Sequence, residues 1–451
     1  MPESRKFFLF IGSSTSDAAV SKLKTANVHY RIKRLESYPE NWQKIIDLLE
    51  DPLLVGVVAK ITGSVYGLID RSDYAECAPR LLEALGKTNH VAFIHETILL
   101  GEDEVDSTDV PQDDEYEEWT REDFYREYFR NPPAEVRERV ESLLHAQNIQ
   151  VTPFKTNAEV SVLAASFIDD HDKNLLFRIY VPSSRIYAGE ADKLIGLFRE
   201  WLARVGKHGV RQDGYRTGAG QVYEFFGDET LDSASLRREF SDFSTFLTMC
   251  AEDPSAAAAE LSALVPDRRD AADIVSRYGK EARRLQIDLR QERESRMLAI
   301  RHRIESDFLE ISHSAEFPWG QIDEFINSSI PAASSPMHIL SLSATGVSPV
   351  TVNVNQQIIH AVESTIVQNV QGTVHLGPEA KELLSLIERF GGDDAQTLES
   401  AVHEVEDDDA RLAERLGAKQ RLKAFLARNR EAAEGVAVGA LLKYLESKFG
   451  I

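Results

Sequence analysis

The stretch KFFLFIGSSTSDAAV, residues 6–20, decides the expected fold. It joins an apolar run of strand length, residues 7–11, through Gly12, Ser13 and Ser14 to a segment with helical spacing. A second run, LLVGVV at 53–58, is apolar on both faces, as is typical of an interior strand of a parallel sheet covered by helices.

The same alternation of strands and helices continues to about residue 170. Strands are expected at 7–11, 28–32, 53–61, 91–95 and 149–151, and helices at 17–25, 42–49, 74–85, 134–146 and 157–168. This order indicates an open parallel α/β sheet, with the domain occupying residues 1–170.

Ligands of such sheets bind at the carboxyl ends of the strands, which is where Gly12, Ser13 and Ser14 stand. Free N–H groups at the start of the following helix could hold a phosphate or ribose there. The alternative is a simple turn, because Ser and Thr are common helix N-caps and Gly is common in turns. The sequence contains neither GxGxxG nor GxxxxGK[ST].

The loop after the third strand, ITGSVYGLIDRSDYAEC at 61–77, is the second candidate for this ligand site. Its polar and aromatic side chains would share the rim with the serines, and a carboxylate there could contact a ribose or stabilise a cationic sugar transition state. In the alternative interpretation, Asp73 caps the next helix and Glu76 lies in its first turn. The candidates in this loop are Ser64, Tyr66, Asp70, Tyr74 and Glu76.

The motif FFLFIGSSTSD and the elements after it, over residues 5–100, resemble the Toll/interleukin-receptor-like (TIR-like) fold, a flavodoxin-like arrangement. The family includes bacterial enzymes that cleave nicotinamide from NAD with a Glu in a Ser-x-Trp-Cys-x-x-Glu pattern. Residues 64–70 match this spacing with Asp70 in place of Glu, and Glu76 is the other carboxylate. The resemblance implies NAD as a substrate and no bound cofactor, with Glu76 favoured because Asp70 is shorter by one methylene.

The formal net charge of −23 argues against a nucleic-acid or anionic-membrane partner. The N-terminal apolar run is too short for a signal peptide and no run reaches the length of a membrane helix, so we expect a cytoplasmic protein. Cys77 and Cys250 fit a reducing compartment, and no metal-ligand spacing is found.

An acidic insert interrupts the α/β domain at residues 101–131. Residues 102–127 hold thirteen acidic and two basic side chains. The segment is either a docking segment for a basic partner or a solvated surface excursion.

The middle of the chain predicts an α+β domain at 171–265 followed by a long helix at 266–312. A strand at 175–181, a helix at 191–205 and a hairpin around 218–220 are expected in that domain. Arg204, Arg211 and Arg216 form either an anion-binding patch or ordinary surface charge. The long helix either bridges domains or packs against a second copy in a coiled coil.

The remaining segments are a linker at 313–350, a strand pair at 351–377 and a helical bundle at 378–451. Polar strands that cannot complete a core alone favour pairing between chains, so we expect a homo-oligomer. These strands resemble stalks of bacterial conflict and anti-phage proteins. The leading hypothesis is therefore a cytoplasmic, oligomerising defence effector that binds a nucleotide-like ligand and hydrolyses NAD. The alternative is a non-enzymatic protein-interaction scaffold or sensor.

Overall fold

The computed structural model describes residues 5–100, 131–206, 208–227, 233–264, 268–309, 376–430 and 438–449, together with isolated positions between 320 and 373. The chain forms two compact units. The first unit comprises residues 1–173 and 411–445, and the second unit comprises residues 174–410 and 446–451.

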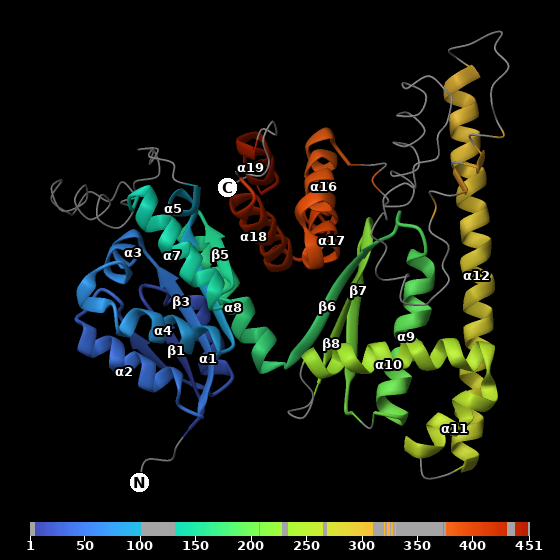
Figure 1. Ribbon diagram of the computed structural model, residues 1–451, viewed down its shortest axis with the longest axis horizontal. Helices are drawn as coiled ribbons and strands as arrows, with labels where there is room; N and C mark the ends of the chain where they lie inside the picture. Colours follow the sequence, from blue (N-terminus) through green and yellow to red (C-terminus); the bar gives the residue numbers. More distant parts are fainter. Residues whose placement is uncertain are drawn as a thin grey trace. The chain divides into compact units, whose positions relative to one another are not determined.

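The first unit contains the expected parallel sheet, drawn in blue to teal in Figure 1. All four strand pairs are parallel and the order is β2-β1-β3-β4-β5. The prediction of an open parallel α/β fold is confirmed. The strands are β1 (Phe7–Ile11), β2 (His29–Lys33), β3 (Leu54–Ile61), β4 (His90–His95) and β5 (Val151–Phe154).

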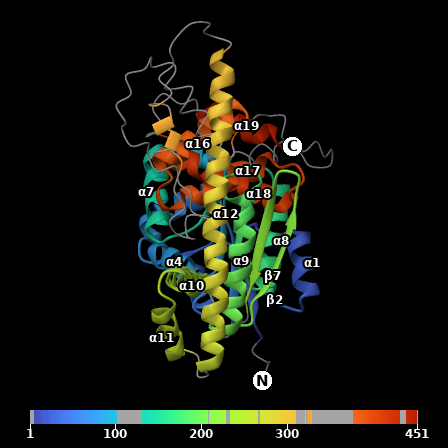
Figure 2. The ribbon, with the colours of Figure 1, turned by 90° about the vertical axis from the view of Figure 1, so that its right-hand side faces the viewer.

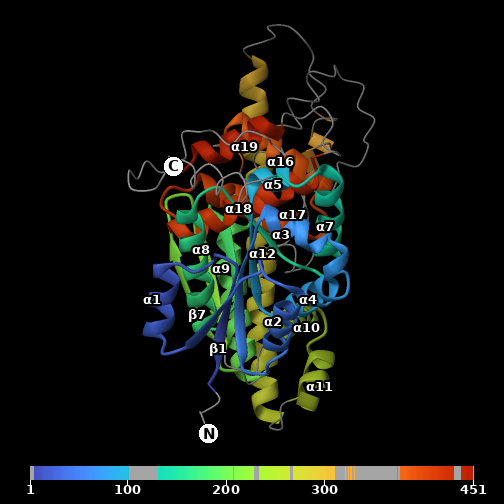
Figure 3. The same cartoon turned by 90° about the vertical axis from the view of Figure 1, so that its left-hand side faces the viewer.

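Helices cover both faces of this sheet, because alternate residues of its central strands are apolar on both sides. Leu9 lies in the core beneath α2 and α4, whereas Phe8 packs edge-on against Phe167 of α8. Figure 3 shows α1 and α8 on one side of the sheet and α2 and α4 on the other. The helices are α1 (Asp17–Thr25), α2 (Pro39–Leu49), α3 (Gly63–Ile69), α4 (Cys77–Gly86), α5 (Glu96–Leu100), α7 (Ala134–Ala146) and α8 (Asn157–Asp172), with a 3₁₀ turn at Ser72–Tyr74.

Hydroxyl side chains begin three of these helices, as the capping preference of Ser and Thr predicts. Ser16 accepts a hydrogen bond from Ala19 N at the start of α1, and Thr62 does the same for Val65 N at the start of α3. Thr156 forms a reciprocal capping box with Glu159 at the start of α8.

The second unit confirms the α+β middle with its long helix. The antiparallel order is β6-β8-β7, with β6 (Leu175–Pro182), β7 (Arg211–Arg216) and β8 (Gly220–Phe226). The helices α9 (Ala188–Arg204), α10 (Ser233–Glu252), α11 (Pro254–Leu264) and α12 (Arg268–Leu309) follow. Figure 2 shows α12, whose 42 residues span about 63 Å.

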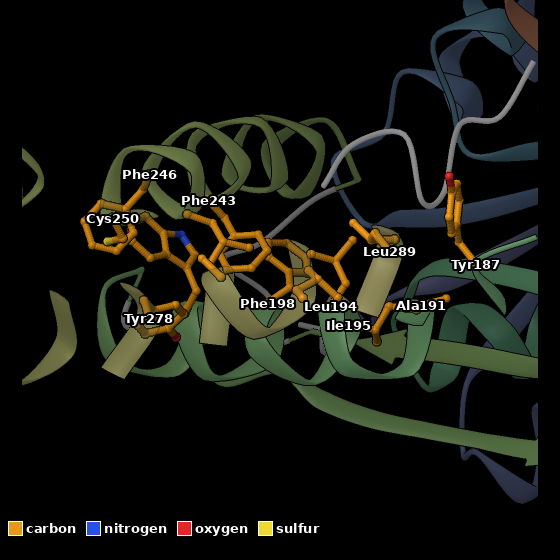
Figure 4. Close-up of a cluster of buried hydrophobic side chains, with 14 of the residues drawn as sticks. Tyr187, Ala191, Leu194, Ile195, Phe198, Phe243, Phe246, Cys250, Tyr278 and Leu289 are labelled. Atoms are coloured by element: carbon orange, nitrogen blue, oxygen red, sulfur yellow. The ribbon is translucent and has the colours of Figure 1, made fainter. Parts of the chain in front are cut away.

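An aromatic cluster fixes these helices on one another (Figure 4). Phe198 of α9 stacks edge-on to Phe240 and near Phe243 of α10, and Phe243 and Phe246 both meet Tyr278 of α12. Cys250 is buried in this cluster, where burial raises the pKa of its thiol to about 12. Cys250 is therefore a core residue.

The expected C-terminal helices are present, and they are divided between the two units. α16 (Pro378–Phe390) and α17 (Ala395–Glu406) belong to the second unit, α18 (Leu412–Arg428) belongs to the first, and α19 (Val438–Ser447) crosses the boundary. The physical reason is that α17 and α18 each bind a different sheet through buried charges. In the second unit, Arg178 of β6 pairs with Glu404 at 2.5 Å and Tyr180 donates to Asp407 at 2.7 Å.

Most of the acidic insert (101–130), most of the linker and most of the strand pair at 351–377 lie outside the described residues. Among the helices that the structure describes, none combines the length and apolarity needed to cross a membrane.

Candidate functional site at the carboxyl edge of the parallel sheet

The turn after β1 is a packed turn. Gly12 has φ +75°, and a Cβ there would stand 2.3 Å from the carbonyl oxygen of Lys60, so only glycine fits. Ser14 is 1% exposed and donates its hydroxyl hydrogen to Val58 O at 2.8 Å. Of the three residues proposed here as ligand contacts, only Ser13 is exposed.

The polar groups of α3 also serve the fold. Ser64 Oγ lies 2.8 Å from Thr62 Oγ1, and Thr62 donates to Glu36. Tyr66 is fully buried in the core. Burial, and then Glu141, raise the pKa of the Tyr66 hydroxyl, which has no hydrogen-bond partner within the described part of the chain.

The two candidate catalytic carboxylates lie in different surroundings. Asp70 ends α3 and receives two parallel hydrogen bonds from Arg139 of α7, at 2.8 and 2.9 Å. Glu76 is exposed just before α4. Tyr74 between them is buried against Trp42 and donates its hydroxyl hydrogen to Ser37 O at 2.7 Å.

Residues 61–77 were expected to form a loop, but they contain helix α3. This helix and the turn after β1 follow adjacent strands, and the space between them and α4 is apolar. A gap of about 10 Å³ there is lined by aliphatic side chains alone: Ile11, Leu35, Leu49, Ala59, Ile61, Val65, Ile69, Leu81, Leu82 and Leu85. The proposed serine and carboxylate groups therefore do not line this space.

The proposed anion patch is similarly spread out. Arg211 and Arg216 stand at opposite ends of β7, about 17 Å apart by strand geometry. Arg211 pairs with Asp213 at 3.2 Å, Arg216 donates to Gln221, and Arg204 ends α9. Arg211 and Arg216 therefore do not form one compact anion site with each other.

A different polar cluster lies at the carboxyl ends of β3, β4 and β5. Lys60 of β3 is 3% exposed and donates to Asn157 Oδ1 at 2.9 Å, with its ammonium 4.8 Å from the centre of the Phe154 ring. Burial lowers the pKa of Lys60 to about 8, although Glu36 opposes this shift.

His95, at the end of β4, is held in one tautomer. Its Nε2 lies 3.1 Å from Lys155 O, which can only accept, and its Nδ1 lies 3.4 Å from the backbone N–H of Thr97, which can only donate. The neutral ring satisfies both contacts. The pKa of His95 is lowered to about 4, chiefly by burial and also by the nearby Lys60 and Lys423, although the hydrogen bond to Lys155 O opposes this shift.

Helix α18 completes the cluster with two buried lysines one turn apart. Lys419 Nζ lies 2.8 Å from Glu159 Oε1, with side chains that are 0% and 2% exposed, and Lys423 pairs with Glu96. Glu159 also accepts from Lys155 N at 2.7 Å. Burial would raise the pKa of Glu159, but Lys419 and this backbone N–H outweigh it and lower the pKa.

We define Lys60, Glu96, His95, Glu159, Lys419 and Lys423 as the edge cluster. Its chemistry is that of buried, charge-assisted hydrogen bonds, which fix the position of a helix with high geometric specificity. The sequence did offer a signal for a buried charge at Lys60, because this lysine stands inside the apolar run VVAKI. No pattern in the sequence pointed to Lys419, which lies 260 residues from its partner.

Among the described residues, no group of His, Cys, Asp and Glu side chains is arranged to hold a metal ion. Comparison of the chain with protein-family models, curated proteins and solved structures found no match.

Proposed function

We propose that this chain is a multidomain interaction and sensing protein in which the carboxyl edge of the parallel sheet holds helix α18. The observation that carries the proposal is the edge cluster, because it places a helix from the far end of the chain where α/β sheets bind their ligands. Buried lysine–glutamate pairs favour one docked geometry and penalise any departure from it.

Chain connectivity supports a sensing role. Only residues 407–411 separate α17, which is bound to β6 in the second unit, from α18 in the first. The connection between the two helices is therefore five residues long, and the proposed signal passes along the chain from α17 to α18. Self-association, a cytoplasmic location and a role in bacterial defence are further parts of this proposal.

NAD hydrolysis is the competing function, with Glu76 or Asp70 as the carboxylate. Two observations favour the interaction function over it: Asp70 is engaged by Arg139, and Glu76 is exposed. The test incubates the full chain, concentrated and dilute, with NAD and measures free nicotinamide. We expect no release above buffer. Release that is lost in Glu76→Ala or Asp70→Ala would establish hydrolysis instead.

The docking of α18 is tested in the full chain by hydrogen–deuterium exchange. Replacing both lysines with methionine, Lys419→Met and Lys423→Met, is expected to speed exchange in α18 and in the first turn of α8. The matched control is Arg421→Met, which removes an exposed cation from the same helix. Unchanged exchange in the double variant would show that the edge cluster does not hold α18.

A further inference from the structure

Strand β2 is an open edge of the parallel sheet. It pairs with β1 and with no other described strand, and four of its five residues are exposed, whereas β1 is buried throughout. Parallel strands are normally covered on both faces and protected at the edge. An exposed strand of this kind offers a template on which another chain can pair.

The backbone contacts show which groups point to the open side. Lys33 O accepts a hydrogen bond from Gly12 N at 2.8 Å, so the polar backbone groups of Lys33 face β1. Because direction alternates along a strand, the N–H and C=O groups of Tyr30 and Ile32 face outward. Tyr30 and Ile32 are 36% and 50% exposed, which leaves apolar surface beside these groups.

The charge of this edge is opposite to that of the chain. Residues 29–35 contain three Lys and Arg side chains and one His but no Asp or Glu, in a chain of net charge −23. Arg31 projects from the face opposite Tyr30, with its guanidinium 4.1 Å from the centre of the Phe7 ring. Arg34 is exposed immediately after the strand.

We infer that β2 is the docking edge for an extended acidic peptide of a partner protein, which adds to the sheet as a new strand. Outward N–H and C=O groups supply the main-chain hydrogen bonds, Ile32 and Tyr30 supply apolar contact, and the cations select acidic side chains. A nucleic acid fits less well, because phosphates cannot satisfy the N–H donors and the C=O acceptors together and the whole chain is strongly negative. The inference goes beyond the function proposed above and depends on neither α18 nor the edge cluster.

The test measures fluorescence anisotropy of a labelled synthetic peptide that alternates Glu with Val, titrated with the full chain at low salt. The same peptide with Gln in place of Glu tests the charge. A third peptide keeps every Glu but carries N-methyl groups on alternate amides, which removes strand hydrogen bonding without changing the charge. We expect the parent peptide to bind at least about tenfold more tightly than either analogue.

Substitutions then place the peptide on β2. Lys33→Glu and Arg34→Glu are each expected to weaken binding about tenfold. Lys24→Glu, the same change at an exposed position of α1 away from the strand, should leave binding within about twofold. Circular dichroism checks that each variant is folded. If Lys33→Glu does not fold, the binding affinity of Arg34→Glu alone tests whether the peptide docks on β2. Equal binding of the N-methylated peptide, tighter binding of a single-stranded oligonucleotide, or no binding of the parent peptide would overturn the inference.

Discussion

Lys419 and Glu159 are 260 residues apart in the chain, yet their side chains form a fully buried ion pair 2.8 Å long. Burying either charge without the other costs several kcal/mol, whereas the pair itself adds little net stability. Its main effect is therefore to restrict the positions that α18 can take.

Breaking the pair from one side should be costly. Lys419→Met leaves Glu159 as a buried carboxylate without its cation, and we expect the first unit to lose about 3–5 kcal/mol of stability. Urea unfolding followed by hydrogen exchange in α8 and α18 measures this loss. The double variant Lys419→Met/Glu159→Gln should recover a large part of it, whereas additive losses would contradict coupling between the two residues.

Lys60 should make stability depend on alkaline pH. Its pKa of about 8 lies below the ordinary value of 10.5, so between these pH values the unfolded chain binds more protons than the folded chain. Stability should therefore rise as the pH increases from 8 to 10.5, by at most about 3 kcal/mol from this residue. Denaturation at several pH values, with the Lys60→Met curve subtracted, isolates the effect. A difference between the two curves that stays constant with pH would refute it.

His95 should make the stability of the fold depend on pH in the acid range. With a pKa of about 4 in the folded state against 6.5, it stays neutral when folded and binds a proton on unfolding between these values. Stability should consequently fall as the pH drops from 6.5 to 4. Imidazole resonances in a nuclear magnetic resonance titration should show His95 still neutral at pH 5.5, and His95→Gln should flatten this part of the stability curve. A His95 resonance that titrates near pH 6.5 would be inconsistent with the burial described.

Two glycines of the same rim should respond in opposite directions to alanine. Gly12→Ala places a methyl group 2.3 Å from Lys60 O at a positive φ, and we expect a loss of at least about 2 kcal/mol. Gly67→Ala adds a methyl group with no neighbour within 4 Å inside α3, so a gain of about 0.5–1 kcal/mol is expected. Thermal unfolding of the two variants provides the comparison. Tolerance of Gly12→Ala would mean that the turn can open as a ligand loop.

The sheet could be predicted from the sequence because its strands and the starts of its helices are determined by residues that are neighbours in the chain. Apolar runs such as residues 7–11 define strands by themselves, and Ser16 and Thr156 mark the starts of their helices. The C-terminal helices were also found individually. Their division between two units was not, because it depends on which distant sheet each helix binds.

The site was harder to predict, since its side chains acquire their roles only through distant partners. Asp70 has the spacing of a catalytic carboxylate, but Arg139, 69 residues later, engages it. Ser14 has the right place for a ligand contact, but its hydroxyl bonds to Val58 O. The sequence shows which polar groups lie at the carboxyl ends of the strands. It does not show which of these groups form hydrogen bonds or ion pairs with residues far away in the chain.

The discontinuity of the first unit has a consequence for protein synthesis. When the ribosome has made residues 1–173, the whole parallel sheet has been synthesised, but α18 is still more than two hundred residues away. Glu159 and Glu96 therefore remain solvated until Lys419 and Lys423 have been translated. A nascent or truncated chain therefore presents an acidic, unfinished edge, and chaperones and proteases would distinguish it from the finished protein.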